Sequence, residues 1–582
     1  MPRPGSIGAL SFATVIVFVG VVACLEGSVP ASASRAAGPQ LPSPTPGVVQ
    51  ASPADLALAI QALIDGGDPA LGVVTRAERA ELHELYQPGG YSPLWLDAAG
   101  RPDRNARDAL SLLNAAADEG LDPADYRRGH LETLTARFQT ASPALPANRA
   151  RFDVALSSGV LRYLRHLHMG RVDPRTIGFR LNAPVDHHDF PAMLRVALGD
   201  HRVAETAADL TPPLAQYRAL RAMLARYRSL AADPTRESPP LVTTAVRPGD
   251  AYAGFGILYR ELATFGDLPT AIPAPAGSGP YEGALVDGVK RFQVRHGLEP
   301  DGILGKSTVA ALRVPITWRV RQIELALERL RWLPHLGDER LIVMNIPMFR
   351  LWAWDGIPPN GAPLFGMDVI VGRALNTQTP VFVEEMREVI FRPYWNVPRS
   401  ILRHETLPAL ARDPDYLRKQ NMEIVRGPGD NAQVVEATPE NIARLSDGSL
   451  RVRQRPGPKN ALGLIKFAFP NQENVYMHGT PAQALFARSR RDFSHGCVRV
   501  EDPVALAEWV LRDRPEWTRE RILAATRGAQ SIYVKLAQPI QVILFYTTAA
   551  VMPEDNTIRF ADDIYRHDAR LDRALTSRRS GD

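Results

Sequence analysis

The spacing of apolar residues changes along the chain and divides it into regions of different periodicity. Over residues 54–245 apolar side chains recur every three or four positions, for example at Leu56, Ile60 and Ile64, which gives a helix one apolar face. From residue 336 onward the apolar segments become short and rich in β-formers; they cover residues 341–346, 366–371, 388–391, 463–469 and 475–477. The pattern therefore predicts a multidomain α+β protein, in which a helical domain precedes a β-rich one.

A smaller unit is predicted between these two domains, over residues 250–315. Its apolar residues fall at helical spacing, and a turn at residues 297–305 leads into a further helix that begins near Ser307. Residues 316–335 carry another amphipathic pattern. We expect that segment to be a helix connecting the small unit to the β-rich domain.

The β-rich domain is predicted to extend over residues 336–550 and to contain one long insertion. The insertion, residues 398–459, has little strand pattern and many polar, Gly- and Pro-containing turns. Residues 532–536 and 541–546 predict two closing strands on either side of Pro539. Residues 551–582 form a tail that we expect to dock on this domain.

The amino terminus has the pattern of an export segment. An apolar run from Ile7 to Cys24 follows a basic residue, and small residues at positions 31–33 offer a cleavage site. Residues 1–33 are thus predicted to be a signal peptide, with an uncleaved membrane anchor or a lipid on Cys24 as alternatives. Residues 34–53 are rich in Pro, Ser and Gly and predict a flexible linker.

Composition narrows the classes of function. The 582-residue chain has a net charge of +5, and its basic residues are scattered rather than striped, so we expect no nucleic-acid partner. The sequence contains two cysteines, Cys24 and Cys497. Removal of Cys24 with a signal peptide would leave one thiol and no possible disulfide, as a catalytic cysteine requires in an oxidising compartment.

The surroundings of Cys497 contain the groups that acyl transfer needs. Free cysteine is mostly protonated at neutral pH, with a pKa of about 8.5, so a base must activate it. His478 lies at the end of an apolar segment and can take the proton and later return it to a leaving amine. Gly479 and Gly496 permit close approach of backbone to substrate, which suits an oxyanion hole built from the amides around Gly496 and Cys497.

Other interpretations of the same residues remain open. Cys497 could be a small buried residue, and Arg499 could simply brace a turn. His478, His495 and Cys497 are also competent zinc ligands, although no HExxH or paired CxxC motif accompanies them. Asp502 is predicted to be structural, because Asp at an N-cap followed by Pro503 begins a helix.

The segment His478-Gly479-Thr480 and the later segment Ser494-His495-Gly496-Cys497-Val498-Arg499 resemble the signature of the L,D-transpeptidases, the YkuD-type cysteine enzymes of peptidoglycan. The resemblance implies that Cys497 is the nucleophile, that His478 is the base, and that the backbone carbonyl of Gly479 orients the imidazole. It further implies a set of substrate and oxyanion residues, namely Ser494, His495, Gly496, Arg499 and Thr480.

Other segments resemble the large multidomain members of this family in Gram-negative bacteria. The helical region is similar to their scaffold domain, and residues 287–293 with 301–308 resemble the three-helix peptidoglycan-binding domain. The insertion at 398–459 resembles their lid, or capping loop, and residues 460–467 also match the family. A purely structural helical module remains the alternative for residues 250–315.

This resemblance implies a periplasmic enzyme that cleaves the diaminopimelate–D-Ala bond of a tetrapeptide stem and forms a 3-3 cross-link to a second stem. The implied reaction needs neither a metal nor an organic cofactor, and carbapenems would acylate Cys497. Peptidoglycan stem peptides are the expected partners, with other cell-wall enzymes as further candidates, and membrane contact only through the amino-terminal segment.

Three alternatives to this function differ in kind. Water could accept the acyl group, which would make the enzyme an L,D-carboxypeptidase, since acceptor choice depends on pocket shape. The lysine of an outer-membrane lipoprotein could be the acceptor instead. A cell-wall-binding scaffold without catalysis is the third alternative, which the presence of both His478 and Cys497 disfavours.

Overall fold

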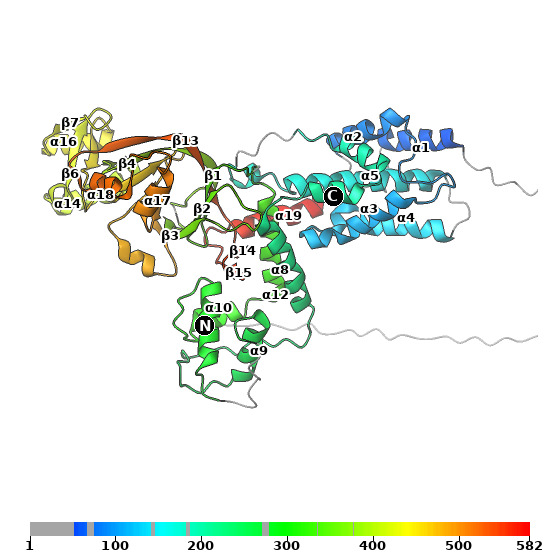
Figure 1. Ribbon diagram of the computed structural model, residues 1–582, viewed down its shortest axis with the longest axis horizontal. Coiled ribbons are helices and arrows are strands. Elements are labelled where there is room, and N and C mark those ends of the chain that lie inside the picture. The colour runs from blue at the N-terminus through cyan, green and yellow to red at the C-terminus, as the bar shows by residue number, and fades with distance from the viewer. Residues whose placement is uncertain are drawn as a thin grey trace, which may run out of the picture. The chain divides into compact units, whose positions relative to one another are not determined.

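The computed structural model describes residues 52–66, 75–140, 146–181, 187–269, 279–334, 336–375 and 377–581. The predicted signal segment, the lipidation alternative at Cys24 and nearly all of the predicted linker therefore lie outside the described residues. The described part is a multidomain α+β protein, as predicted from the periodicity (Figure 1). None of its helices is long and apolar enough to cross a membrane.

The first domain consists of helices packed around α5 (Pro146–Met169). The other helices of this domain are α1 (Pro53–Gly66), α2 (Arg76–Tyr86), α3 (Arg104–Asn114), α4 (Arg128–Thr140), α6 (Phe190–Gly199) and α7 (Val203–Asp209), and α8 (Ala215–Ala231) follows them in the chain. Asp153 on α5 is fully buried and accepts hydrogen bonds from the Tyr86 hydroxyl (2.6 Å) and the backbone of Trp95 (3.0 Å). These bonds satisfy a carboxyl group that would otherwise be costly to bury.

The small unit contains the helices α9 (Phe255–Phe265), α10 (Ala284–Arg295) and α11 (Lys306–Leu312), and it has a hydrophobic core of its own. Gln293 on α10 organises the turn before α11, because its side chain donates to Asp301 (2.8 Å) and accepts from the Gly302 N–H (2.9 Å). Gly302 has a φ of +70°, and a Cβ there would lie 2.8 Å from Val286, so this turn requires glycine.

Helix α12 (Ile316–Leu330) follows the small unit and lies beside α8 (Figure 1). Apolar residues of both helices, such as Leu224 and Leu327, belong to the same core as the strands of the β-rich domain. Helix α8 therefore shares its core with the β-rich domain and not with α5.

Nine strands of the described residues form the main sheet, in the order β11-β3-β12-β10-β9-β4-β13-β1-β2. Strand β3 also pairs with β2, so the sheet closes on itself. Helices α17 (Pro503–Val510) and α18 (Arg519–Arg527) follow β12, and the predicted N-cap Asp502 accepts from the N–H groups of Val504 and Ala505. The strands are β1 (Arg340–Asn345), β2 (Arg350–Asp355), β3 (Phe365–Gly372), β4 (Phe382–Phe391), β9 (Ile465–Ala468), β10 (Met477–His478), β11 (Asp492–Ser494), β12 (Val498–Val500) and β13 (Ile532–Phe545).

Two predictions about strands were wrong. The two closing strands expected around Pro539 are one strand, β13, whose register against β4 shifts between Lys535 and Ile540. Pro539 has no backbone N–H to donate to β4, but the shift in register around it lets the two halves of β13 remain paired with β4.

The insertion was predicted to have little strand pattern, yet it contributes three strands, β6 (Met422–Arg426), β7 (Gln433–Val435) and β8 (Arg451–Gln454). Together with β5 (Trp395–Asn396) they form a four-stranded sheet in the order β5-β8-β6-β7. These strands are short and carry charged residues, which hides their alternation. They pack with α13 (Arg399–Ile401), α14 (Leu407–Arg412), α15 (Tyr416–Lys419) and α16 (Pro439–Asp447) around a separate small core.

The tail contains the hairpin β14 (Ala549–Val551) and β15 (Ile558–Phe560), followed by α19 (His567–Gly581). The Tyr565 hydroxyl in this tail donates to the carbonyl of Gly372 (2.5 Å) and accepts from the N–H of Thr379 (3.2 Å). The tail thereby contacts the end of β3 and the segment that follows it.

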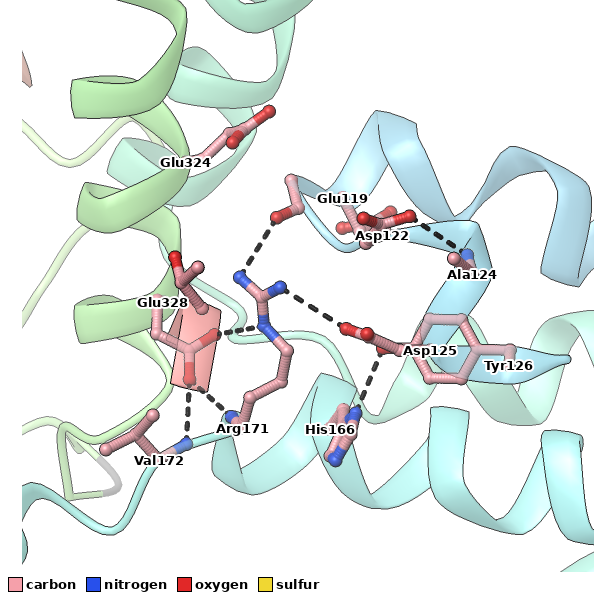
Figure 2. Close-up of polar contacts among 12 residues, drawn as sticks. Glu119, Asp122, Ala124, Asp125, Tyr126, His166, Arg171, Val172, Glu324 and Glu328 are labelled. Atoms are coloured by element: carbon pink, nitrogen blue, oxygen red, sulfur yellow. Dashed lines mark hydrogen bonds and ion pairs between the residues drawn. The ribbon is translucent and has the colours of Figure 1, made fainter. Parts of the chain in front are cut away.

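A buried ion-pair network joins the first domain to α12 (Figure 2). Glu328 on α12 has no exposed side-chain surface and accepts from the backbone N–H groups of Arg171 and Val172 and from the Arg171 guanidinium (3.2 Å). Arg331 pairs with the same carboxylate at 3.4 Å and donates to the Tyr217 hydroxyl (2.7 Å). Burial disfavours the charged form of Glu328, but the combined attraction of the Arg171 and Arg331 guanidinium groups is the larger effect. The pKa of the Glu328 carboxyl is therefore held below its usual value.

We expect Glu328→Gln to lower the free energy of unfolding by about 3 to 5 kcal/mol, because it removes the buried carboxylate that two guanidinium groups share and leaves Arg171 only its longer ion pair with Asp125 (3.5 Å). Urea unfolding followed by fluorescence measures the change. The matched control is Glu132→Ala, which removes an exposed partner of Arg128 (2.8 Å) and should change stability by less than about 0.5 kcal/mol. Equal effects of the two substitutions would contradict this role for Glu328.

Candidate active site

Parallel pairing of β10 and β12 brings the two halves of the sequence motif together. In this register Met477 lies opposite Val498, and His478 lies opposite Arg499. The N–H of Val498 donates to the carbonyl of Tyr476 (3.0 Å). Cys497 directly precedes β12 and is therefore held beside the start of β10, although nearly twenty residues separate it from His478 in the sequence.

Side chains alternate along a strand, so this register also decides which residues share a face of the sheet. Met477, its partner Val498 and its other partner Phe467 on β9 are buried in the core. His478 lies opposite both Arg499 on β12 and Lys466 on β9. A second face is thereby assembled that carries five polar side chains; they are Lys466, Tyr476, His478, Cys497 and Arg499.

The imidazole of His478 is held by the backbone of the next residue, Gly479. Its Nδ1 lies 2.6 Å from the carbonyl oxygen of Gly479, the contact that the resemblance implies, and a carbonyl can only accept, so Nδ1 carries the proton. Gly463 makes this arrangement possible, because a Cβ there would lie 2.6 Å from Gly479 and Thr480 backbone atoms. Burial is the main cause that lowers the pKa of His478 to about 3, so the imidazole is neutral over the physiological range.

The turn before Cys497 is held by Ser494. Its hydroxyl donates to the carbonyl of Cys497 (2.6 Å) and accepts from the Gly496 N–H (3.1 Å). Gly496 has a φ of +112°, a conformation that favours glycine, and its carbonyl accepts from the Thr379 hydroxyl (2.8 Å). The Gly496 N–H, expected to serve an oxyanion hole, is thus occupied, whereas the Cys497 N–H has no partner among the described residues.

The thiol of Cys497 is partly exposed and faces the carbonyl of Asn474, with 3.8 Å between Sγ and oxygen. Burial raises the pKa of this thiol above its usual value; the Tyr476 backbone and hydroxyl and then the charges of Lys466 and Arg499 oppose that shift. Burial, followed by the proximity of Cys497, also raises the pKa of Tyr476. The resting group is therefore a thiol that requires a base, and not a preformed thiolate.

Three cationic side chains influence this face. The Lys466 ammonium lies 3.9 Å from the centre of the Tyr476 ring, which is a cation–π contact. Burial lowers the pKa of Arg499, and the like charge of Arg373 lowers it further. Like charges that face one another favour binding of an anion such as a carboxylate. Thr480, also predicted for the site, is buried and its hydroxyl accepts from the Ala482 N–H (3.2 Å), which braces the next turn.

His495 faces the insertion instead of the thiol. Its Nε2 lies 2.6 Å from Oε1 of Glu405, and Glu405 belongs to a π-helical turn at Leu402–Thr406. Such turns occur often at functional sites. This contact links the insertion to the residue two positions before Cys497.

Sequence reasoning did not assign Lys466, Tyr476, Arg373 or Glu405 to the site. Lys466 lies inside a segment that matched the family. A signal for Lys466 and Tyr476 exists in the alternation of strands β9 and β10 once the register is known. Glu405 carries no such signal, because its position depends on the fold of the insertion.

The zinc alternative has no support in the geometry of the described residues. Among them, no group of three or more His, Cys, Asp or Glu side chains is placed to hold a metal ion. His478 and His495 point to different partners, the Gly479 carbonyl and the Glu405 carboxylate.

We expect Lys466→Met to slow the alkylation of Cys497 by iodoacetamide roughly three- to ten-fold at neutral pH, because loss of one nearby cation raises the thiol pKa by up to about one unit. In the unchanged chain the rate should still increase above pH 9, since burial raises the pKa of Cys497. Between pH 7 and 5 it should fall about ten-fold per unit, because His478 stays neutral there and only the thiol titrates. Mass spectrometry of the adduct gives the rate.

Lys459→Met is the matched control for this measurement, because Lys459 is exposed and lies outside the polar face. It should leave the rate within two-fold (about 0.4 kcal/mol) of the unchanged chain. A Lys466→Met chain that reacts as fast as the control would contradict the electrostatic role of Lys466.

We expect Glu405→Ala to accelerate the reaction of Cys497 with a bulky maleimide, because it removes the contact between the insertion and His495. The pair is partly exposed, with 31% and 52% of the two side chains accessible. Exposed pairs contribute at most about 1 kcal/mol, which limits the increase to about five-fold. Glu436→Ala, another exposed substitution in the insertion, should not change the rate; an identical rate in both variants would exclude a closing role for Glu405.

Comparison with known proteins agrees with this geometry. Residues 339–523 match the family described as the L,D-transpeptidase catalytic domain (YkuD). Residues 256–312 match the "Putative peptidoglycan binding domain" family, and residues 80–224 match a family described as a scaffold domain.

A protein of Haemophilus influenzae named "Putative L,D-transpeptidase" is 31% identical to the chain over 256 residues. The similarity covers 44% of this chain and 49% of that protein. The chain thus spans about half the length of the curated relative it matches.

Proposed function

Because the chain carries a YkuD-type L,D-transpeptidase catalytic domain together with a peptidoglycan-binding domain and a scaffold domain, we propose that it is a peptidoglycan L,D-transpeptidase with Cys497 as its nucleophile. The observation that carries the proposal is the single polar face on which Cys497 and His478 lie, next to Arg499 and Lys466. This arrangement combines a nucleophile, a base and an anion-binding surface.

In the proposed reaction, His478 takes the proton from Cys497, and Sγ attacks the carbonyl carbon of the third residue of a tetrapeptide stem. Because Nδ1 of His478 already carries a proton, Nε2 is the atom that accepts the thiol proton. The Cys497 N–H supports the proposed oxyanion, because it has no other partner among the described residues. The same imidazole then protonates the terminal D-Ala amine as it leaves.

The acyl group then passes from Cys497 to the side-chain amine of a second stem, which completes a 3-3 cross-link. Arg499 and Arg373 are the proposed contacts for a stem carboxylate. Burial and then the like charge of Arg373 lower the pKa of Arg499, and a bound anion would relieve the repulsion between the two guanidinium groups. The insertion at 398–459 serves as a lid, which Glu405 fastens to His495. The proposal includes an exported, periplasmic enzyme, in line with the predicted signal segment.

We expect the chain beginning at Gln40, mixed with purified disaccharide-tetrapeptide, to yield dimers that lack one D-Ala. Cys497→Ala should yield none, and His478→Ala should reduce the rate by at least about 100-fold, because it removes the general base. Mass spectrometry of the products is the measurement. A carbapenem should add its mass to the unchanged chain and not to Cys497→Ala.

The other possible outcomes each identify a different function. Tripeptide monomers without dimers would move the assignment to an L,D-carboxypeptidase. Conjugates formed only when a lysine-containing lipoprotein peptide is present would indicate lipoprotein attachment. Unchanged substrate in all samples would overturn the catalytic proposal and favour a wall-binding scaffold.

A further inference from the structure

A cleft of about 450 Å³ lies between the small helical unit and the β-rich domain. Its walls come from the turn after α10 (residues 294–300), the β1–β2 turn (347–350), the segment before β11 (486–491) and the tail (559–564). Neither Cys497 nor His478 lines it, so the cleft is separate from the candidate active site.

Positive charge predominates in this cleft. Three carboxylates line it, from Glu299, Asp368 and Asp562. Its described lining also contains six arginines, an excess of three positive charges; they are Arg295, Arg350, Arg488, Arg490, Arg491 and Arg559. His296 adds no charge, because burial lowers its pKa well below the usual value.

Most of these arginines already have carboxylate partners. Arg350 and Arg491 share Asp368, at 3.2 and 3.0 Å. Arg490 pairs with Asp492 (2.7 Å), and the buried Arg295 pairs with Asp267 (2.5 Å). These four side chains therefore form a fixed wall.

Two arginines and one indole in the cleft have unused donors. Arg488 is exposed and has no carboxylate partner among the described residues. The Nε of Arg559 is buried and has no hydrogen-bond partner within the described residues, and the same holds for Nε1 of Trp352, which is 7% exposed. Buried donors are rarely left unsatisfied, so a bound acceptor would complete them.

The walls of the cleft continue into the candidate active site. The segment that carries Arg488 leads through β11 directly to Ser494 and Cys497. Strand β3 holds Asp368 at the cleft and, four residues later, Gly372, which contacts Tyr565 near the turn of Gly496. Four residues of strand correspond to roughly 13 Å. A long ligand can therefore reach both places.

We propose that this cleft binds carboxylate groups of a peptidoglycan strand beyond the stem that reacts at Cys497. The inference rests on the proposed function, which makes peptidoglycan the substrate. Stem peptides carry free carboxylates, and guanidinium groups bind carboxylates through paired hydrogen bonds. One wall of the cleft belongs to the unit that matches a peptidoglycan-binding family, and the other belongs to the catalytic domain. The cleft thus aligns the strand with the reacting thiol.

The test uses a double charge reversal, Arg488→Glu with Arg559→Glu, in the full chain with Cys497→Ala. The Cys497→Ala background prevents turnover, so binding is measured alone. Co-sedimentation with purified insoluble sacculi gives the dissociation constant. We expect at least about ten-fold weaker binding, because two charge-assisted contacts become repulsive. Sacculi whose carboxylates have been converted to amides should lose affinity for the unreversed chain to a similar degree.

Arg527→Glu is the matched control, because Arg527 is an exposed arginine of α18 outside the cleft. It should leave binding within two-fold (about 0.4 kcal/mol) of the parent chain. The single variant Arg488→Glu changes an exposed side chain and keeps the test valid if the double variant fails to fold. It should weaken binding at least three-fold (about 0.65 kcal/mol).

Unchanged binding in a folded Arg488→Glu chain, or equal binding to native and amidated sacculi, would overturn the inference. The second result would indicate recognition of glycan rather than carboxylate. The proposed function is tested separately, by analysing the products that the chain with Cys497 forms from disaccharide-tetrapeptide. If the chain shows no turnover but its binding still depends on Arg488, the inference about the cleft stands and the enzymatic proposal fails.

Discussion

The fold of this chain depends on one buried carboxylate, that of Glu328 on α12. A buried ion is tolerated only when its partners are in place, and here the partners come from separate segments: Arg171 after α5, and Arg331 after α12 itself. Arg331 also reaches the carbonyl of Glu119. Separating the first domain from α12 would therefore break the buried ion pair between Arg171 and Glu328. Helix α12 at the same time shares its apolar face with the strands of the main sheet.

This constraint extends to the candidate active site through the tail. Arg329, on the same helix, makes a fully buried ion pair with Asp568 in α19. The tail that contains Asp568 places the Tyr565 hydroxyl between Gly372 and Thr379. Thr379 in turn donates to the carbonyl of Gly496, directly before Cys497. The turn that holds Cys497 is thus supported from the connecting helix by successive hydrogen bonds, although no residue of α12 approaches the thiol.

Sequence patterns were sufficient for the parts that depend on local chemistry and insufficient for those that depend on register. His478 and Cys497 could be nominated as candidates because glycine, histidine and cysteine at fixed positions have few structural uses together, and the register of β10 and β12 brings them to one face. Lys466 could not, because it joins the site only through its pairing with His478 on a neighbouring strand. The single strand across Pro539 was missed because proline normally interrupts a ladder. The sheet in the insertion was missed because its short, charged strands lack apolar alternation.

The electrostatics of the polar face keep Cys497 protonated at rest. Lys466 and Arg499 each lower the thiol pKa, yet burial outweighs them, so Cys497 rests protonated. A protonated thiol reacts slowly with oxidants and alkylating agents. An anionic substrate would partly neutralise these cations and raise the thiol pKa further. In the reaction that we propose, the proton of Cys497 therefore leaves through His478 while Sγ attacks, and no free thiolate has to form beforehand.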